Sequence, residues 1–342
     1  MPDVTVPTGT RRPIGGVVVA ISMALLIASC TTEEQSSPGP TLTSTTSTTT
    51  TAVPTTTEPP VDSTTSTAAP PESTTTAAPT GPADALVPLF IGGADSAGWL
   101  FLGAWQQDRW QESTDPGGNP IRPGIEAGAA FVVSNLEGET AAVLGDNTEA
   151  CFDGRVGPAI DVAVAQPDPP GFGYAAVAVF QQPWELKPRP VAVTSSAPEA
   201  YRALGAAAFD DEPVDATQGA IEQLVVTDLD GDGDDEAIAA FEFIQPSAGP
   251  GAPGDHAALL VIDATTRAAE TVLLSAVPEE DDDDPGSFEI IERFRVLDVA
   301  DLNGDGRTEV LVHAWYYEGA AVIVYTYDDG ELTEVLAAGC GA

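Results

Sequence analysis

The stretch that decides the fold is Asp301–Glu309, with the sequence DLNGDGRTE, which runs directly into the apolar segment VLV at 310–312. Oxygen-bearing side chains occupy its first, third, fifth and ninth places. A chain that wraps around one hard cation turns alternate residues inward, and a glycine at the sixth place permits the positive φ that this wrapping needs. The seventh place needs only a backbone carbonyl, so Arg307 is acceptable there. The spacing indicates a calcium loop.

A second copy lies upstream at Asp228–Glu236, DLDGDGDDE, and it too runs into an apolar segment, AIAAF at 237–241. Asp-Gly strings are also common in hydrated turns between strands, which is the alternative for a single copy. Because the nine-residue pattern recurs with the same flanks, Ca²⁺ is the favoured interpretation of both.

Both loops resemble those of the FG-GAP and VCBS repeat families, the integrin alpha-like repeats, in which D-x-[DN]-x-D-G-x-x-[DE] lies between strands of a β-propeller blade. The ninth place is Glu in both loops, where Asp is common in these families. For the upstream loop the resemblance implies side-chain ligands Asp228, Asp230, Asp232 and Glu236, with Asp234 at the seventh place. For the downstream loop it implies Asp301, Asn303, Asp305 and Glu309, with Arg307 at the seventh place.

The segments around the loops repeat as well, at about 221–276 and 293–338. Each contains a strand, the loop, a strand, a hairpin, a strand, a turn and a strand. A repeat of about 45 to 60 residues with four short strands is typical of a propeller blade. We therefore expect an all-β fold of antiparallel, β-propeller-like repeats that forms a partial or small propeller. A β-sandwich that uses the same loops is the alternative.

Charge and cysteine content limit the partners and the compartment. The net charge of −41 disfavours nucleic acid and anionic lipid surfaces, and favours cations, neutral glycans or proteins with basic patches. Cys151 and Cys340 are far apart, no CxxC spacing occurs and the chain has 2 histidines, so zinc is disfavoured. We expect these cysteines to form a disulfide in an oxidising compartment.

The N-terminal region predicts export and anchoring. Two arginines at 11–12 precede an apolar run at 14–27 that is too short to span a bilayer and fits a secretory signal. The run ends in Ile-Ala-Ser-Cys at 27–30, which resembles the lipobox of bacterial lipoproteins. The resemblance implies a signal peptide at 1–30, lipidation of Cys30 and an extracytoplasmic protein anchored to the bacterial cell membrane; an ordinary signal peptide is the alternative. Residues 31–83 are rich in Thr, Ser, Pro and Ala and predict a disordered tether.

The β-repeat domain is expected over 84–342, and its first half lacks a calcium loop. Trp105 and Trp110 are expected to fill the core rather than to stack on sugar rings. One short helix is expected at 200–204, with Ser196 and Glu199 forming a capping box. Short strands are predicted at 87–90, 99–105, 129–133, 140–144, 160–164 and 175–180.

Catalytic signatures are scarce in this chain. The sequence has no G-x-S-x-G, no H-E-x-x-H, no P-loop, and no G-x-G-x-x-G after a strand. Acid pairs for glycoside chemistry carry no signal here because carboxylates are so abundant. The main hypothesis is a non-enzymatic binding or adhesion module for a glycan or protein at the cell surface. The alternative is a secreted glycan-active hydrolase or lyase.

Overall fold

The computed structural model describes most of the chain from residue 86 onward. The predicted signal peptide at 1–30, with Cys30, and the predicted linker at 31–83 lie outside the described residues. The described residues are 86–92, 98–114, 123–151, 156–162, 174–245, 251–263, 265–278, 290–328 and 330–341.

The two repeats that carry the acidic loops each form a four-stranded antiparallel meander. In both, the acidic loop joins the first strand to the second, and a short strand β8 (Ala192–Thr194) extends the first meander beside β9. The first meander consists of β9 (Ala220–Thr227), β10 (Glu236–Phe243), β11 (His256–Ile262) and β12 (Ala269–Ala276). The second consists of β13 (Arg293–Ala300), β14 (Glu309–Tyr316), β15 (Gly319–Asp328) and β16 (Glu331–Gly341). The predicted all-β fold with antiparallel sheets is confirmed.

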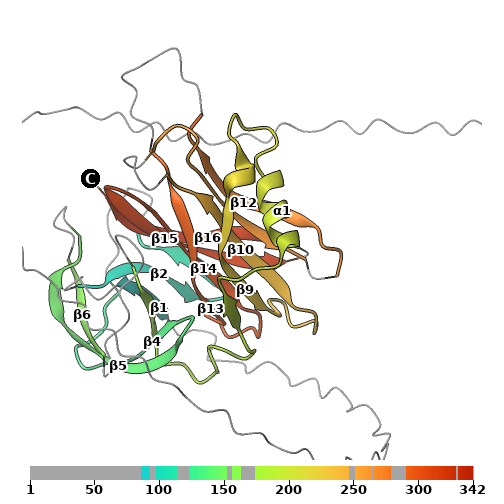
Figure 1. Ribbon diagram of the computed structural model, residues 1–342. Helices are drawn as coiled ribbons and strands as arrows, with labels where there is room; N and C mark the ends of the chain where they lie inside the picture. The colour runs from blue at the N-terminus through green and yellow to red at the C-terminus, as the bar shows by residue number, and fades with distance from the viewer. Residues whose placement is uncertain are drawn as a thin grey trace, which may run out of the picture. The chain divides into compact units, whose positions relative to one another are not determined.

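The first half of the domain is built differently. Its described strands form one curled seven-stranded sheet in the order β3-β2-β1-β7-β4-β5-β6, in which β7 joins two three-stranded meanders (Figure 1). No four-stranded blade forms among the described residues 87–180. The strands are β1 (Val87–Gly92), β2 (Leu100–Gln106), β3 (Arg109–Glu112), β4 (Ala130–Asn135), β5 (Gly138–Glu149), β6 (Val156–Val162) and β7 (Ala176–Phe180).

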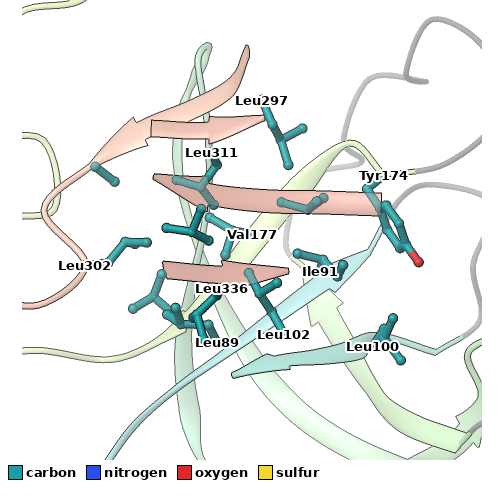
Figure 2. Packing of buried hydrophobic residues seen from close by; sticks show 14 of the residues in the cluster. Leu89, Ile91, Leu100, Leu102, Tyr174, Val177, Leu297, Leu302, Leu311 and Leu336 are labelled. Atoms are coloured by element: carbon teal, nitrogen blue, oxygen red, sulfur yellow. The ribbon is translucent and has the colours of Figure 1, made fainter. Parts of the chain in front are cut away.

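Strand β14, in the middle of the β13–β16 sheet, is buried on both faces. Leu311 and Val324 pack against Leu89 and Leu102 of the curled sheet, in the cluster that Figure 2 shows. On the opposite face, Val310 and its neighbours pack against the β9–β12 sheet. Successive residues of a strand point to opposite faces, so a strand between two layers needs apolar residues at every position. This explains why the segments after both loops are continuous apolar runs.

A helix, α1 (Glu199–Ala207), covers the outer face of the β8–β12 sheet together with the short 3₁₀ turn η1 (Ala216–Gln218) (Figure 1). Gly205 permits this close packing, because a Cβ there would lie 2.3 Å from the Phe241 ring. The predicted capping box is wrong: the helix begins after Pro198 with no side-chain cap. The Glu199 carboxylate instead pairs with Arg202, at 2.5 Å.

A disulfide joins the C-terminal strand to the first half of the domain. Cys340 in β16 and Cys151 after β5 form a disulfide with a Cα–Cα distance of 5.6 Å across 189 residues of sequence. The Tyr174 hydroxyl donates to the Cys340 sulfur at 3.0 Å. The last strand is therefore attached to the curled sheet by a covalent bond as well as by packing.

Candidate metal centre

Two acidic loops, Asp228–Asp235 (loop 1) and Asp301–Thr308 (loop 2), each lead into the Glu that begins the next strand. Their fourth and sixth places are glycines with positive φ: 84° and 98° for Gly231 and Gly233, and 78° and 85° for Gly304 and Gly306. Other residues adopt this conformation at a cost, so the glycines let both loops turn tightly.

The first aspartate of each loop organises the backbone around itself. In loop 1, the Gly231 and Gly233 N–H groups donate to the two oxygens of Asp228, at 2.6 and 3.2 Å. In loop 2, the Gly304 and Gly306 N–H groups donate to the two oxygens of Asp301, at 2.6 and 3.0 Å. The two loops share this arrangement bond for bond.

The third and fifth places form successive turns in which one side-chain oxygen accepts from the N–H two residues on. Asp230 accepts from Asp232 N–H at 3.1 Å, and Asp232 accepts from Asp234 N–H at 2.8 Å. In loop 2, Asn303 accepts from the Asp305 N–H at 2.9 Å, and Asp305 accepts from the Arg307 N–H at 2.8 Å. In each of the three aspartates, the second oxygen takes no part in this turn.

The glutamate at the ninth place closes each loop. Glu236 Oε2 accepts from Leu229 N–H at 2.9 Å, and Glu309 Oε2 accepts from Leu302 N–H at 2.7 Å. Both glutamates are buried, with 4 % and 2 % of their surface exposed. They lie under the loop rather than at its rim.

The seventh-place side chains point away from the loop centres. Asp234 accepts a hydrogen bond from the Thr265 hydroxyl at 3.1 Å, and Arg307 pairs with Asp328 at 2.7 Å. Only the backbone of these two residues is left for a ligand role, as the spacing requires.

Three of the proposed ligand carboxylates of the first site lie close together. Asp228, Asp230 and Glu236 each place an oxygen within 4.8 Å of the others. In loop 2 the Asn303 amide Nδ2 donates to Asp305 at 3.1 Å and to Glu309 at 2.9 Å. Carboxylate and amide oxygens together with a backbone carbonyl are the donors that Ca²⁺ prefers, so the converging oxygens of loop 1 fit this ion, although Asp232 is not among them. In loop 2 the Asn303 amide directs its nitrogen, not its oxygen, at Asp305 and Glu309, so the likeness to loop 1 lies in the shared sequence pattern and backbone bonds.

Burial makes these carboxylates need a counter-charge. Burial raises the pKa of Glu236 to about 7 and that of Asp301 to about 6, and neighbouring carboxylates add to the rise. Burial also raises the pKa of Glu309 well above its ordinary value. A buried carboxylate is unfavourable until a proton or a cation neutralises it.

The segment Gln182–Pro190, here called the strap, lies against both loops and was missed by the sequence analysis. Trp184 Nε1–H donates to Asp301 O at 2.9 Å, and Leu186 O accepts from Asp301 N–H at 2.7 Å. Arg189 Nη1 donates to Asp228 O at 3.1 Å. The only sequence signal is its prolines, which disfavour helix and restrict the residues before them.

The strap also carries the chain's only lysine, Lys187, to a buried aspartate. Lys187 Nζ lies 2.8 Å from Asp298 Oδ1 in β13, and it donates to Asn135 O at the end of β4. Burial raises the pKa of Asp298, and Lys187 opposes that rise. This ion pair connects the strap to the β13–β16 sheet and to the curled sheet.

The two tryptophans considered for sugar binding pack instead on the core. Trp105 and Trp110 face each other across β2 and β3 with ring centroids 4.9 Å apart, edge to face. Both are partly buried against the cluster of Figure 2. This favours the core role for the pair.

Comparisons with protein-family models, with curated proteins and with solved structures find no match to this chain. Among the described residues, no helix is both long enough and apolar enough to span a membrane.

Proposed function

We propose that the chain is a non-enzymatic binding module whose β repeats are stabilised by two structural Ca²⁺ ions. The observation that carries the proposal is the bond-for-bond identity of the two loops around buried glutamates. Loop 1 would hold its ion with Asp228, Asp230, Asp232, Glu236 and the Asp234 carbonyl. Loop 2 would use Asp301, Asn303, Asp305, Glu309 and the Arg307 carbonyl.

The ions have a structural role in this proposal. All ligands of each loop come from nine consecutive residues, and each loop joins two adjacent strands of one meander. A bound ion supplies positive charge to carboxylates that otherwise repel each other, and so holds the two strands and the strap together. A catalytic ion would need an open coordination position directed at a substrate.

The wider role follows from the rest of the chain. We propose that Cys30 carries a lipid anchor, that residues 31–83 hold the domain away from the bacterial membrane, and that the domain binds a glycan or a protein. The lipobox-like sequence and the acidic composition support this assignment. The Cys151–Cys340 disulfide supports an oxidising compartment.

Calcium titration of the full chain by isothermal calorimetry tests the proposal directly. We expect two Ca²⁺ per chain, one per chain in either Asp232→Ala or Asp305→Ala, and none in the double variant. No heat of binding in the wild-type chain would contradict the calcium assignment.

A second experiment tests the anchor and the partner. Cys30→Ala should release the protein from the membrane fraction into the medium, and the released protein can then be screened on glycan and surface-protein arrays. Membrane partitioning that Cys30→Ala leaves unchanged would rule out the lipid anchor.

A further inference from the structure

Arg189 in the strap contacts both loops. Its Nη1 donates to Asp228 O at 3.1 Å and to Leu229 O at 3.3 Å, while its Nη2 donates to Gly306 O of loop 2. Its Nε lies 3.5 Å from the Asp228 carboxylate. One guanidinium group thus binds the first ligand residue of loop 1 and the sixth place of loop 2.

The surroundings of Arg189 suit a bridge rather than a loose surface contact. Only 18 % of its side chain and 17 % of the Asp228 side chain are exposed, so water screens the interaction weakly. A Cβ at Gly231 would lie 2.3 Å from Arg189 Nη2. The absence of a side chain at this place lets the guanidinium approach loop 1 closely.

The two loops also touch each other directly. Leu229 O accepts from the Thr308 N–H at 3.0 Å and from the Thr308 hydroxyl at 3.2 Å. The same carbonyl therefore receives bonds from loop 2 and from Arg189. Leu229 follows the first ligand of loop 1, and Thr308 precedes the last ligand of loop 2, so neither can shift without moving a proposed ligand.

We infer that Arg189 couples the two loops, so that Ca²⁺ binding at one raises the affinity of the other. This inference rests on the proposed calcium sites. An ion in either loop fixes the backbone carbonyls that Arg189 binds, and so fixes the guanidinium. The second loop is then already ordered on its Arg189 side and loses less conformational entropy when its ion binds.

The coupling depends on shape as well as charge. The planar guanidinium presents a fork of five N–H donors, which reaches both loops at once. A lysine at 189 keeps the positive charge beside Asp228 but has one nitrogen, so it can satisfy only one loop. Arg189→Lys therefore separates bridging from simple electrostatic attraction.

Calorimetric titration of the full chain with Ca²⁺ measures this coupling. Asp232→Ala leaves loop 2 alone and Asp305→Ala leaves loop 1 alone, and the two affinities found this way are compared with the two-site affinity of the chain with both loops. We expect binding in that chain to be about 5- to 10-fold tighter than independent sites allow. In Arg189→Met and in Arg189→Lys we expect this factor to fall by about half or more, and the direct Leu229–Thr308 contact carries the coupling that remains.

Arg202→Met is the matched control, because it removes one positive charge from helix α1, where Arg202 pairs with exposed Glu199. It should keep the coupling factor of the wild type. Circular dichroism of every variant in Ca²⁺ restricts the comparison to folded protein, and Arg189→Lys serves if Arg189→Met does not fold. Two bound ions with a coupling factor of one in the wild type, or an unchanged factor in Arg189→Lys, would overturn the inference while leaving the calcium sites standing. Absence of Ca²⁺ binding would overturn the proposed function itself.

Discussion

Loop 1 and loop 2 have the same backbone hydrogen bonds but different surroundings. Loop 1 together with Glu236 offers four carboxylates as proposed side-chain ligands and lies under the charged Arg189. Loop 2 has three carboxylates and an amide, its Asp301 is 2 % exposed, and the neutral ring of Trp184 lies against Gly304. The same nine-residue pattern therefore lies in two different electrostatic environments. Loop 1 has more negative charge among its proposed ligands, and loop 2 is more deeply buried.

Calcium removal should give the largest effect on stability. With free Ca²⁺ a hundredfold above the dissociation constant, each site adds about 2.7 kcal/mol and both together about 5 kcal/mol. In thermal melts this is a shift of about 10 to 20 °C between Ca²⁺ and chelator. Because loop 1 has the extra carboxylate, Asp232→Ala should lose more of the shift than Asp305→Ala. Equal losses of the melting-temperature shift in the two variants would contradict the expected stronger stabilisation of loop 1 by Ca²⁺.

Loss of the first aspartate should come next. Asp301→Ala removes the loop 2 ion and leaves the N–H groups of Gly304 and Gly306 without their acceptor, for about 4 kcal/mol in Ca²⁺. Asp228→Ala should cost less, since loop 1 is more accessible to water. Urea unfolding of both variants measures the difference, and the matched Asp→Asn variants, which keep an acceptor, serve as controls. A larger loss of unfolding free energy in Asp228→Ala than in Asp301→Ala would contradict this expectation.

Glycine substitution within loop 2 should show what the Trp184 contact contributes there. Gly304→Ala adds strain at φ 78° and a Cβ 2.9 Å from the Trp184 ring, for about 2 kcal/mol in total. Gly306→Ala, at φ 85° with nothing within 4 Å, should cost only the strain of about 1 kcal/mol. Thermal unfolding in chelator checks this, and equal costs would mean that the Trp184 contact adds nothing.

A smaller effect than that of Gly304→Ala is expected from exchanging the residue at the third place. Asn303→Asp gives loop 2 the four carboxylates of loop 1 and removes the amide that bonds Asp305 and Glu309. We expect about tenfold tighter Ca²⁺ binding at loop 2, about 1.4 kcal/mol, with lower stability in chelator. Asp230→Asn should weaken loop 1 by a similar factor. Calorimetry in single-loop backgrounds measures both, and unchanged affinities would show that charge number does not decide the binding strength.

The loops and their flanking strands were predictable because the determinants are local. Gly233 and Gly306 specify turns within their own nonapeptides, and the apolar runs after Glu236 and Glu309 specify buried strands. The calcium assignment remains a prediction, and so do the lipid anchor and the partner.

The strap and the curled sheet were not predictable for the opposite reason. Trp184 contacts Asp301, 117 residues away in sequence, and Arg189 contacts Gly306 at the same separation. The sequence WELKPRP at 184–190 does not indicate which backbone carbonyl groups its side chains contact. The insertion of β7 between β1 and β4 is likewise a pairing across distant residues. The short helix was predictable from its local sequence, but its capping box was predicted wrongly: no side chain caps the helix after Pro198, and Glu199 pairs with Arg202.

Helix α1 covers an apolar sheet face through which copies of this domain could otherwise associate. A sheet with an apolar outer face would accept the sheet of another copy, and layers could then be added without limit. Phe241 and its neighbours form such a face, and the helix packs on it through Gly205. Gly205→Leu should push the helix off the Phe241 ring and expose this face, and we expect size-exclusion chromatography to show association of this variant.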